Sequence, residues 1–278
     1  KGRELAIALS PFFFGILAVL EYFYVPNHEG FSASYVYAEF LALLLLGNLL
    51  SFCLSFRSAK ARKNSLYHAP FRALVFFLLL SYDLLTLKSN ILIMPYFPSI
   101  DQVLSAMLKD RVYLLQCTGS SLFLLFSGYF LGVLVGLLTG IACGYNKKVE
   151  YWIAPFLKLL GAIPSTTWIP IVMVLATSLF RGSVFIIALV VWFSVTLSTI
   201  TGIHNIDKAY YEAAKTLGAK ERDLVLRIAI PSALPSIFQG LVQAMSSACM
   251  ALMIAEMIGV ESGLGWYITW QKSWAEYG

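Results

Sequence analysis

The chain alternates long apolar stretches with short polar ones, a pattern that predicts helices crossing a membrane. A membrane helix needs about 20 mostly apolar residues. Lipid offers the backbone no hydrogen-bond partner, so each such stretch should be helical. We expect seven spans, at 5–24, 35–56, 71–87, 114–145, 151–179, 183–203 and 235–258. The predicted fold is all-α, a polytopic membrane helical bundle.

Composition agrees with this pattern. Of the 278 residues, 59% are hydrophobic and 13% charged, whereas a soluble domain carries about 25% charged residues. The net charge is +5, but the basic residues lie between apolar spans, so no nucleic-acid partner is expected. The cysteines and histidines are scattered without metal-ligand spacing. We therefore predict no metal and no cofactor.

The positive residues predict the orientation of the spans, because they prefer cytoplasmic loops. With the N-terminus in the cytoplasm, one set of loops holds most of them: Lys1, Arg3, Arg57, Lys60, Arg62, Lys63, Arg72, Lys147, Lys148, Lys208, Lys215, Lys220, Arg222 and Arg227. The opposite side holds Lys88, Lys109, Arg111, Arg181 and Lys272. This orientation puts the loop 204–235 in the cytoplasm.

Two further patterns predict a short helix outside the spans and a contact face on one of the spans. The segment 98–111 reads as a short amphipathic helix that Ser99 can cap, lying on the outer membrane surface. Within the span 114–145, glycines recur every four residues and leave one helix face bare. They are Gly128, Gly132, Gly136, Gly140 and Gly144. Such a face lets another helix approach closely, so we predict a tight helix–helix contact there.

The loop 204–235 is the longest polar stretch between spans, and it carries helix start and stop signals. Asp207 is a plausible N-cap for a helix over 208–217. Gly218 suits the left-handed position after that helix. The residues 219–228 could form a second short helix, and two prolines then mark the entry to the next span. The loop therefore reads as a folded helix–turn–helix on the membrane face.

The spacing inside this loop resembles a known motif. Glu212-Ala213-Ala214, Gly218, Ile228 and Ile230-Pro231 are similar to the EAA loop of permeases from binding-protein-dependent ABC importers, with Ile230 in place of the usual leucine. In that family the loop docks into a groove on a separate ATPase and transmits its closure. The resemblance implies that Glu212, Ala213, Ala214, Gly218, Ile228 and Pro231 couple this chain to an ATPase. The alternative is a surface helix stabilised by local charge pairs.

The resemblance extends from about residue 71 to 278 and points to the branch that imports nitrate, sulfonates and taurine. It implies two domains: 1–70, an extra N-terminal helix pair with a basic cytoplasmic loop, and 71–278, the permease domain of the type I fold. It also implies ATPase subunits, a second permease copy, an extracytoplasmic substrate-binding protein and the bacterial inner membrane. That branch has one more helix beyond the position of residue 278, so the permease domain is expected to lack its last helix.

Polar residues inside membrane spans are costly and suggest function. The candidates for a translocation path are Ser165, Thr166, Thr167, Trp192, Ser194, Gln243, Ser246, Ser247 and Glu256. For any single serine or threonine, hydrogen bonding between helices is the commoner explanation.

Other transporter classes fit the sequence less well. The sequence has no GxxxxGK[ST] phosphate loop, so ATP hydrolysis is expected in a partner. It shows no nucleophile–base pair or ligand cluster either, so the chain is not expected to be a membrane enzyme. A secondary carrier driven by an ion gradient stays as the alternative, although the sequence offers neither an internal repeat nor a well-placed coupling acid. An importer of vitamin or pyrimidine precursors is the alternative for the substrate.

Overall fold

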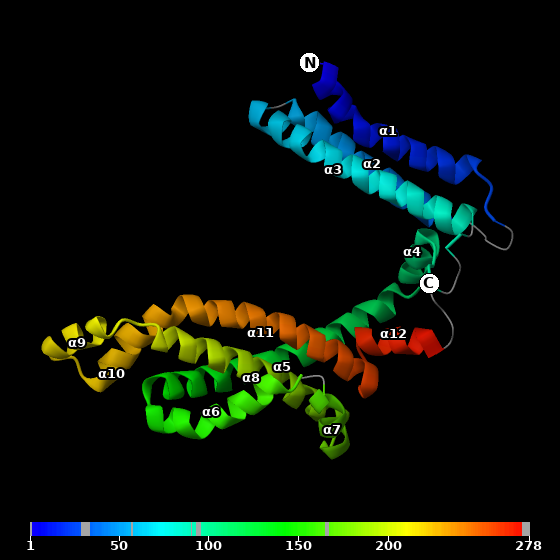
Figure 1. Cartoon of the computed structure of the whole chain (residues 1–278). Helices are drawn as coiled ribbons and strands as arrows, with labels where there is room; N and C mark the ends of the chain where they lie inside the picture. The colour runs from blue at the N-terminus through cyan, green and yellow to red at the C-terminus, as the bar shows by residue number, and fades with distance from the viewer. Residues whose placement is uncertain are drawn as a thin grey trace. The chain divides into compact units, whose positions relative to one another are not determined.

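The computed structural model describes residues 2–28, 34–56, 58–89, 91–92, 96–164 and 167–273, and in these ranges the regular structure is helical (Figure 1). The chain divides into two compact units. One comprises residues 1–111 with 271–278, and the other comprises residues 112–270. The predicted all-α class is confirmed.

The N-terminal unit is built on three long helices. These are α1 (Gly2–Tyr24), α2 (Val36–Ser55) and α3 (Ala59–Asp83), the last extended by a π-helical turn, η1 (Leu84–Lys88). Their shared core contains Tyr37 and Leu41 of α2, Leu80 of α3 and Leu87 of η1. The contacts group α3 with α1 and α2, whereas the predicted division assigned most of this helix to the permease domain. That functional division stays a prediction.

The short helix α4 (Ile100–Lys109) is fixed to α2 by a carboxylate. Ser99 and Gln102 form the capping box that begins α4, so the predicted cap is confirmed. Asp101 then accepts hydrogen bonds from the backbone N–H groups of Ser34, at 2.8 Å, and Tyr37, at 3.2 Å. Because the side chain of Tyr35 does not cap α2, Asp101 supplies that cap from another helix.

The second unit is centred on α8 (Leu179–His204). Its other helical elements, long and short, are α5 (Arg111–Tyr145), α6 (Lys147–Ala162), α7 (Trp168–Leu175), α9 (Lys208–Thr216), α10 (Glu221–Asp223), η3 (Leu224–Ala229), α11 (Ile230–Ile258) and α12 (Leu264–Ser273). The main core joins Ile187, Val191 and Val195 of α8 to Ala244 and Ala248 of α11. This arrangement buries α8 more than any other described helix long enough to span a membrane.

The bare glycine face of α5 lies against α8, as the sequence predicts. A Cβ added at any of the five glycines would fall 2.6–2.9 Å from a side-chain atom of α8. The opposed pairs are Gly128–Ile187, Gly132–Val191, Gly136–Val195, Gly140–Thr199 and Gly144–Ile203. Residue numbers rise together in every pair, so the two helices run parallel. They stay in contact from Gly128 to Gly144 of α5, a rise of about 24 Å at 1.5 Å per residue.

Six described helices are long and apolar enough to cross a membrane, and the prediction of a continuous span over 151–179 is wrong. The chain leaves α6 at Ala162 and resumes a helix at Trp168. Ile163 is extended, with φ −106° and ψ 125°, because the ring of Pro164 disfavours helical backbone at the preceding residue. Since α5 and α8 run parallel, α6 and α7 together must carry the chain back along their length.

The predicted second short helix of the loop, 219–228, is also wrong as a separate element. The chain runs without a break from α10 through η3 into α11. Pro231 lies in the first turn of α11 and has no N–H to donate. The wider π-helical turn of η3 accommodates that ring where a regular α-helical turn would place a carbonyl against it.

Candidate functional site

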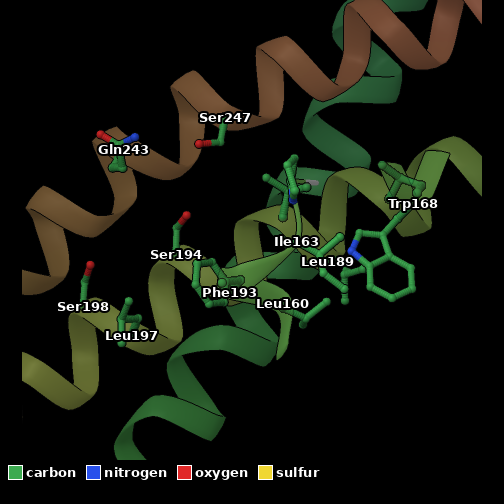
Figure 2. Close-up of a pocket in the computed structure, with 14 residues that line it drawn as sticks. Leu160, Ile163, Trp168, Leu189, Phe193, Ser194, Leu197, Ser198, Gln243 and Ser247 are labelled. Atoms are coloured by element: carbon green, nitrogen blue, oxygen red, sulfur yellow. The ribbon is translucent and has the colours of Figure 1, made fainter. Parts of the chain in front are cut away.

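A cavity of about 400 Å³ opens inside the second unit, between the break that follows α6 and the helices α8 and α11 (Figure 2). Its lining residues are Leu160, Gly161, Ile163, Pro164, Trp168, Ile186, Leu189, Val190, Phe193, Ser194, Leu197, Ser198, Gln243 and Ser247. The break in the predicted span therefore forms one wall of the cavity.

The polar groups of the cavity are uncharged. Figure 2 shows Ser194 and Ser198 on α8 turned toward α11, which carries Gln243 and Ser247. Each pair is four residues apart and so lies on one helix face. Trp168 adds an indole N–H that is buried and has no hydrogen-bond partner within the described part of the chain. A buried donor without a partner is costly, so the indole N–H of Trp168 is a candidate hydrogen-bond donor to a molecule in the cavity.

Only some of the predicted path residues meet at this cavity. Ser194, Gln243 and Ser247 line it, whereas Ser246 is absent from the lining. Trp192 instead donates its indole N–H to Thr139 Oγ1 at 2.9 Å, which holds α8 to α5. Thr167 immediately precedes α7 and is absent from the lining. Ser165 and Thr166 lie outside the described residues.

The path prediction omitted two polar lining residues, Trp168 and Ser198. The signal for Ser198 was present, because it follows the predicted path residue Ser194 by four positions, on the same helix face. The place of Trp168 depends on the bend at Pro164, which turns the start of α7 back toward α8. A pattern of apolar residues does not reveal such a bend.

Glu256, the last predicted path residue, is 1% exposed and does not line the cavity. Its carboxylate accepts a hydrogen bond from Ser121 Oγ at 2.6 Å and another from the backbone N–H of Gly265 at 2.8 Å. Ser121 Oγ in turn accepts from the N–H of Leu264 at 2.9 Å. Glu256 and Ser121 therefore hold the start of α12 against α11 and α5.

The Glu256 carboxylate also explains why residue 263 is a glycine. Gly263 has φ +115°, and a Cβ there would fall 2.2 Å from Glu256 Oε1. Only glycine fits both the backbone conformation and the space. Glu256 thus lies in a compact cluster of hydrogen-bonded groups at the end of α11.

The loop between α8 and α11 has the ends that the sequence predicts. Asp207 accepts from the N–H of Ala209 at 2.9 Å and begins α9. Gly218 has φ +81°. Its N–H donates to Lys215 O, and the N–H of Ala219 donates to Ala214 O, both at 3.0 Å. These two bonds form the Schellman motif that ends a helix on a left-handed glycine.

The outer face of this loop is uncovered. Glu212, Ala213 and Gly218 are exposed and Ala214 is half-buried. Two large apolar side chains accompany them, Tyr210 at 66% and Leu217 at 88% exposure. Further along, Ile228 is half-buried within η3, and Pro231 is exposed at the start of α11. The predicted coupling residues therefore border an apolar surface.

The inner face of the loop is fixed to the bundle. Tyr211 packs beside Ile203, Ala229 and Ala233, and burial raises the pKa of its hydroxyl. Glu221 accepts a hydrogen bond from the Tyr145 hydroxyl and lies 3.8 Å from Lys215 Nζ. The loop is thus joined to both α5 and α11.

Comparison with known proteins locates this unit within a family. Residues 132–278, just over half of the chain, match the model of the binding-protein-dependent transport system inner membrane component. An ABC transporter permease protein of Methanocaldococcus jannaschii is 32% identical over 107 residues, which is 38% of this chain and 40% of the relative.

Two relatives carry the names of substrates. An aliphatic sulfonates transport permease of Bacillus subtilis is 30% identical over 106 residues, and a nitrate import permease of Synechococcus elongatus is 28% identical over 105 residues. Each match covers 38% of this chain and 38% of the relative, so the chain spans well under half of the relatives it matches. Because the family model matches more than half of the chain, the chain belongs to the family of inner membrane components of binding-protein-dependent transport systems.

Proposed function

We propose that the chain is the permease subunit of an ATP-driven importer and that its cavity lies on the translocation path. The observation that carries the proposal is a group of polar side chains lining a cavity, half-buried at Ser194, Ser198 and Ser247, among helices long and apolar enough to span a membrane. Polar groups in such helices are retained where they bind each other or a solute. Ser194, Ser198 and Ser247 face a cavity here.

The substrate class we propose is a small oxyanion such as a sulfonate or nitrate. Hydroxyl, amide and indole N–H groups donate hydrogen bonds to oxyanions. The cavity lining contains no charged side chain, so binding stays weak enough for release, as conduction requires. A volume of about 400 Å³ suits a small solute. Two relatives are named for sulfonates and nitrate.

The second part of the proposal concerns energy coupling. The uncovered face of α9, with Tyr210 and Leu217, docks into a groove on a separate ATPase subunit, and Ala213 and Ala214 allow a close approach. Exposed apolar side chains beside charged ones are typical of an interaction site. The partners are ATPase subunits, a second permease copy and an external substrate-binding protein. The orientation is multi-pass in the inner membrane with the N-terminus in the cytoplasm.

Reconstitution tests this function. The chain, co-expressed with the ATPase and binding protein encoded beside it, is placed in liposomes with ATP inside and labelled sulfonate or nitrate outside. Uptake should require ATP and the binding protein. Uptake driven by an ion gradient in the absence of ATP would support a secondary carrier and contradict the proposal.

A further inference from the structure

The N-terminal unit contains two buried acids that the transport proposal does not use. Glu21 of α1 is 8% exposed and Asp83, the last residue of α3, is fully buried. Lys88, five residues after Asp83, donates to the carbonyl of Tyr22, the neighbour of Glu21, at 3.0 Å, so the ends of the two helices that carry these acids lie together. They lie in the apolar core of this unit, among neighbours on their own helices such as Ala18, Leu80 and Leu87.

Neither acid has a hydrogen-bond partner with ordinary geometry among the described residues, and this holds for all four carboxyl oxygens. An isolated ionised carboxylate in such surroundings costs several kcal/mol. Two ionised carboxylates side by side would add mutual repulsion. The arrangement therefore disfavours the state in which both are charged.

The nearest cation is Lys88, and its ammonium is already bound elsewhere. Its Nζ donates to the carbonyls of Tyr22 at 3.0 Å and Val25 at 2.7 Å, and to Asn27 Oδ1 at 2.8 Å. Lys88 thus caps the end of α1. Lys88 is an electrostatic neighbour of both acids. A single lysine can balance the charge of only one carboxylate.

The other polar neighbours are also engaged. The Tyr37 hydroxyl donates to Leu79 O at 3.3 Å, and the Tyr22 hydroxyl contacts Ser34 O and Asp101. Asp101 on α4 accepts hydrogen bonds from Ser34 and from the backbone N–H of Tyr37. The polar groups around the acid pair are therefore already hydrogen-bonded to other partners.

We propose that Glu21 and Asp83 form a proton-binding site that holds one proton at neutral pH. With one proton bound, the pair carries a single negative charge, which Lys88 balances. A proton shared by two adjacent carboxyls also satisfies oxygens that otherwise have no donor. A metal ion fits less well, because within the described ranges no three ligating side chains lie together. The proposal does not depend on the transport function.

Infrared spectroscopy of the purified full chain in lipid nanodiscs tests this site, since a protonated carboxyl has a C=O stretch distinct from that of a carboxylate. At neutral pH the wild type should show this band. It should disappear in Glu21→Gln and in Asp83→Asn, because the remaining carboxylate is then balanced by Lys88. Glu39→Gln, which changes an exposed acid of the same unit, should keep the band.

The wild-type spectrum tests whether the acid pair holds a proton even where a variant folds poorly. A wild type without a protonated-carboxyl band at neutral pH would overturn the proposal, as would a band that survives in both folded single variants.

Discussion

Single residues in this chain differ in role even when they look alike in sequence. Gln243 and Glu256 both lie on α11 and both interrupt an apolar helix, so sequence reasoning placed them together on a path. Gln243 lines the cavity, whereas Glu256 is held by Ser121. The partner of Glu256 is 135 positions away. No local pattern reveals a contact of that separation.

Removal of the Glu256 carboxylate should destabilise the protein. Hydrogen bonds to a charged group each contribute about 1.5–3 kcal/mol, so Glu256→Ala should lower the free energy of unfolding by about 3 kcal/mol. Thermal unfolding of the detergent-purified chain measures this loss. Glu261→Ala, at an exposed acid nearby, serves as the control. Equal melting temperatures for the two variants would contradict the structural role of Glu256.

Trp168 should matter for transport rather than for folding. Trp168→Phe keeps the aromatic ring but removes the unpartnered N–H of the cavity. If that N–H binds the substrate, ATP-driven uptake should fall about tenfold, the equivalent of about 1.4 kcal/mol. The control is Trp152→Phe, at an indole that is 73% exposed. Unchanged uptake by Trp168→Phe would separate this residue from the path.

At the scale of elements, features that repeat with the helical period were predictable from the sequence, whereas the breaks and irregular turns in helices were not. The glycines of α5 predicted a bare helix face because they recur with the helical period. The sequence left their partner open, because the apolar positions of α8 resemble those of the other spans. Pro164 and Pro231 were both visible, but their effects differ. Pro164 ends α6, whereas Pro231 is absorbed by η3 because that turn has the wider π-helical register.

The contact between α5 and α8 should tolerate no added side chain. Gly132→Ala places a Cβ 2.7 Å from Val191 Cβ, and such overpacking costs about 1–3 kcal/mol. Gly119→Ala is a matched control on the same helix, because a Cβ there meets nothing within 4 Å. Thermal unfolding should therefore show a lower melting temperature for Gly132→Ala alone. A similar loss in both variants would point to helix α5 itself rather than to its contact.

The end of α9 offers a test of coupling. Gly218→Pro removes the N–H that bonds to Lys215 O and forces φ from +81° to about −65°. We expect ATP hydrolysis by the assembled transporter to continue while substrate uptake is lost. Gly218→Asn should retain uptake, since asparagine tolerates the left-handed conformation. Full uptake in the proline variant would contradict the docking role of this loop.

At the scale of the whole molecule, the membrane character and family followed from the sequence, whereas the grouping of helices did not. The 3.6-residue pattern marks a helix but does not state which helix it packs against. The apolar surfaces of α1, α2 and α3 become one core only through residues such as Tyr37 and Leu87. In addition, a cap for α2 comes from Asp101, more than 60 positions away.

Orientation is testable on intact cells with single cysteines in a background without the four native ones. The charge distribution predicts that a cysteine at Lys215 faces the cytoplasm and one at Lys109 faces outward. A membrane-impermeant maleimide should label Lys109→Cys in intact cells and Lys215→Cys only after permeabilisation. The reverse labelling would invert the proposed topology.

The π-helical turn η3 sets the rotational phase along a continuous run from Glu221 to Ile258. Each residue advances an α-helix by about 100°, so one residue more or fewer in η3 turns everything after it by that angle. Deletion of one residue there would rotate Gln243 and Ser247 away from Ser194 while leaving every side chain of the cavity chemically intact. The direction in which these groups face thus depends on a turn that lies well before them in the chain.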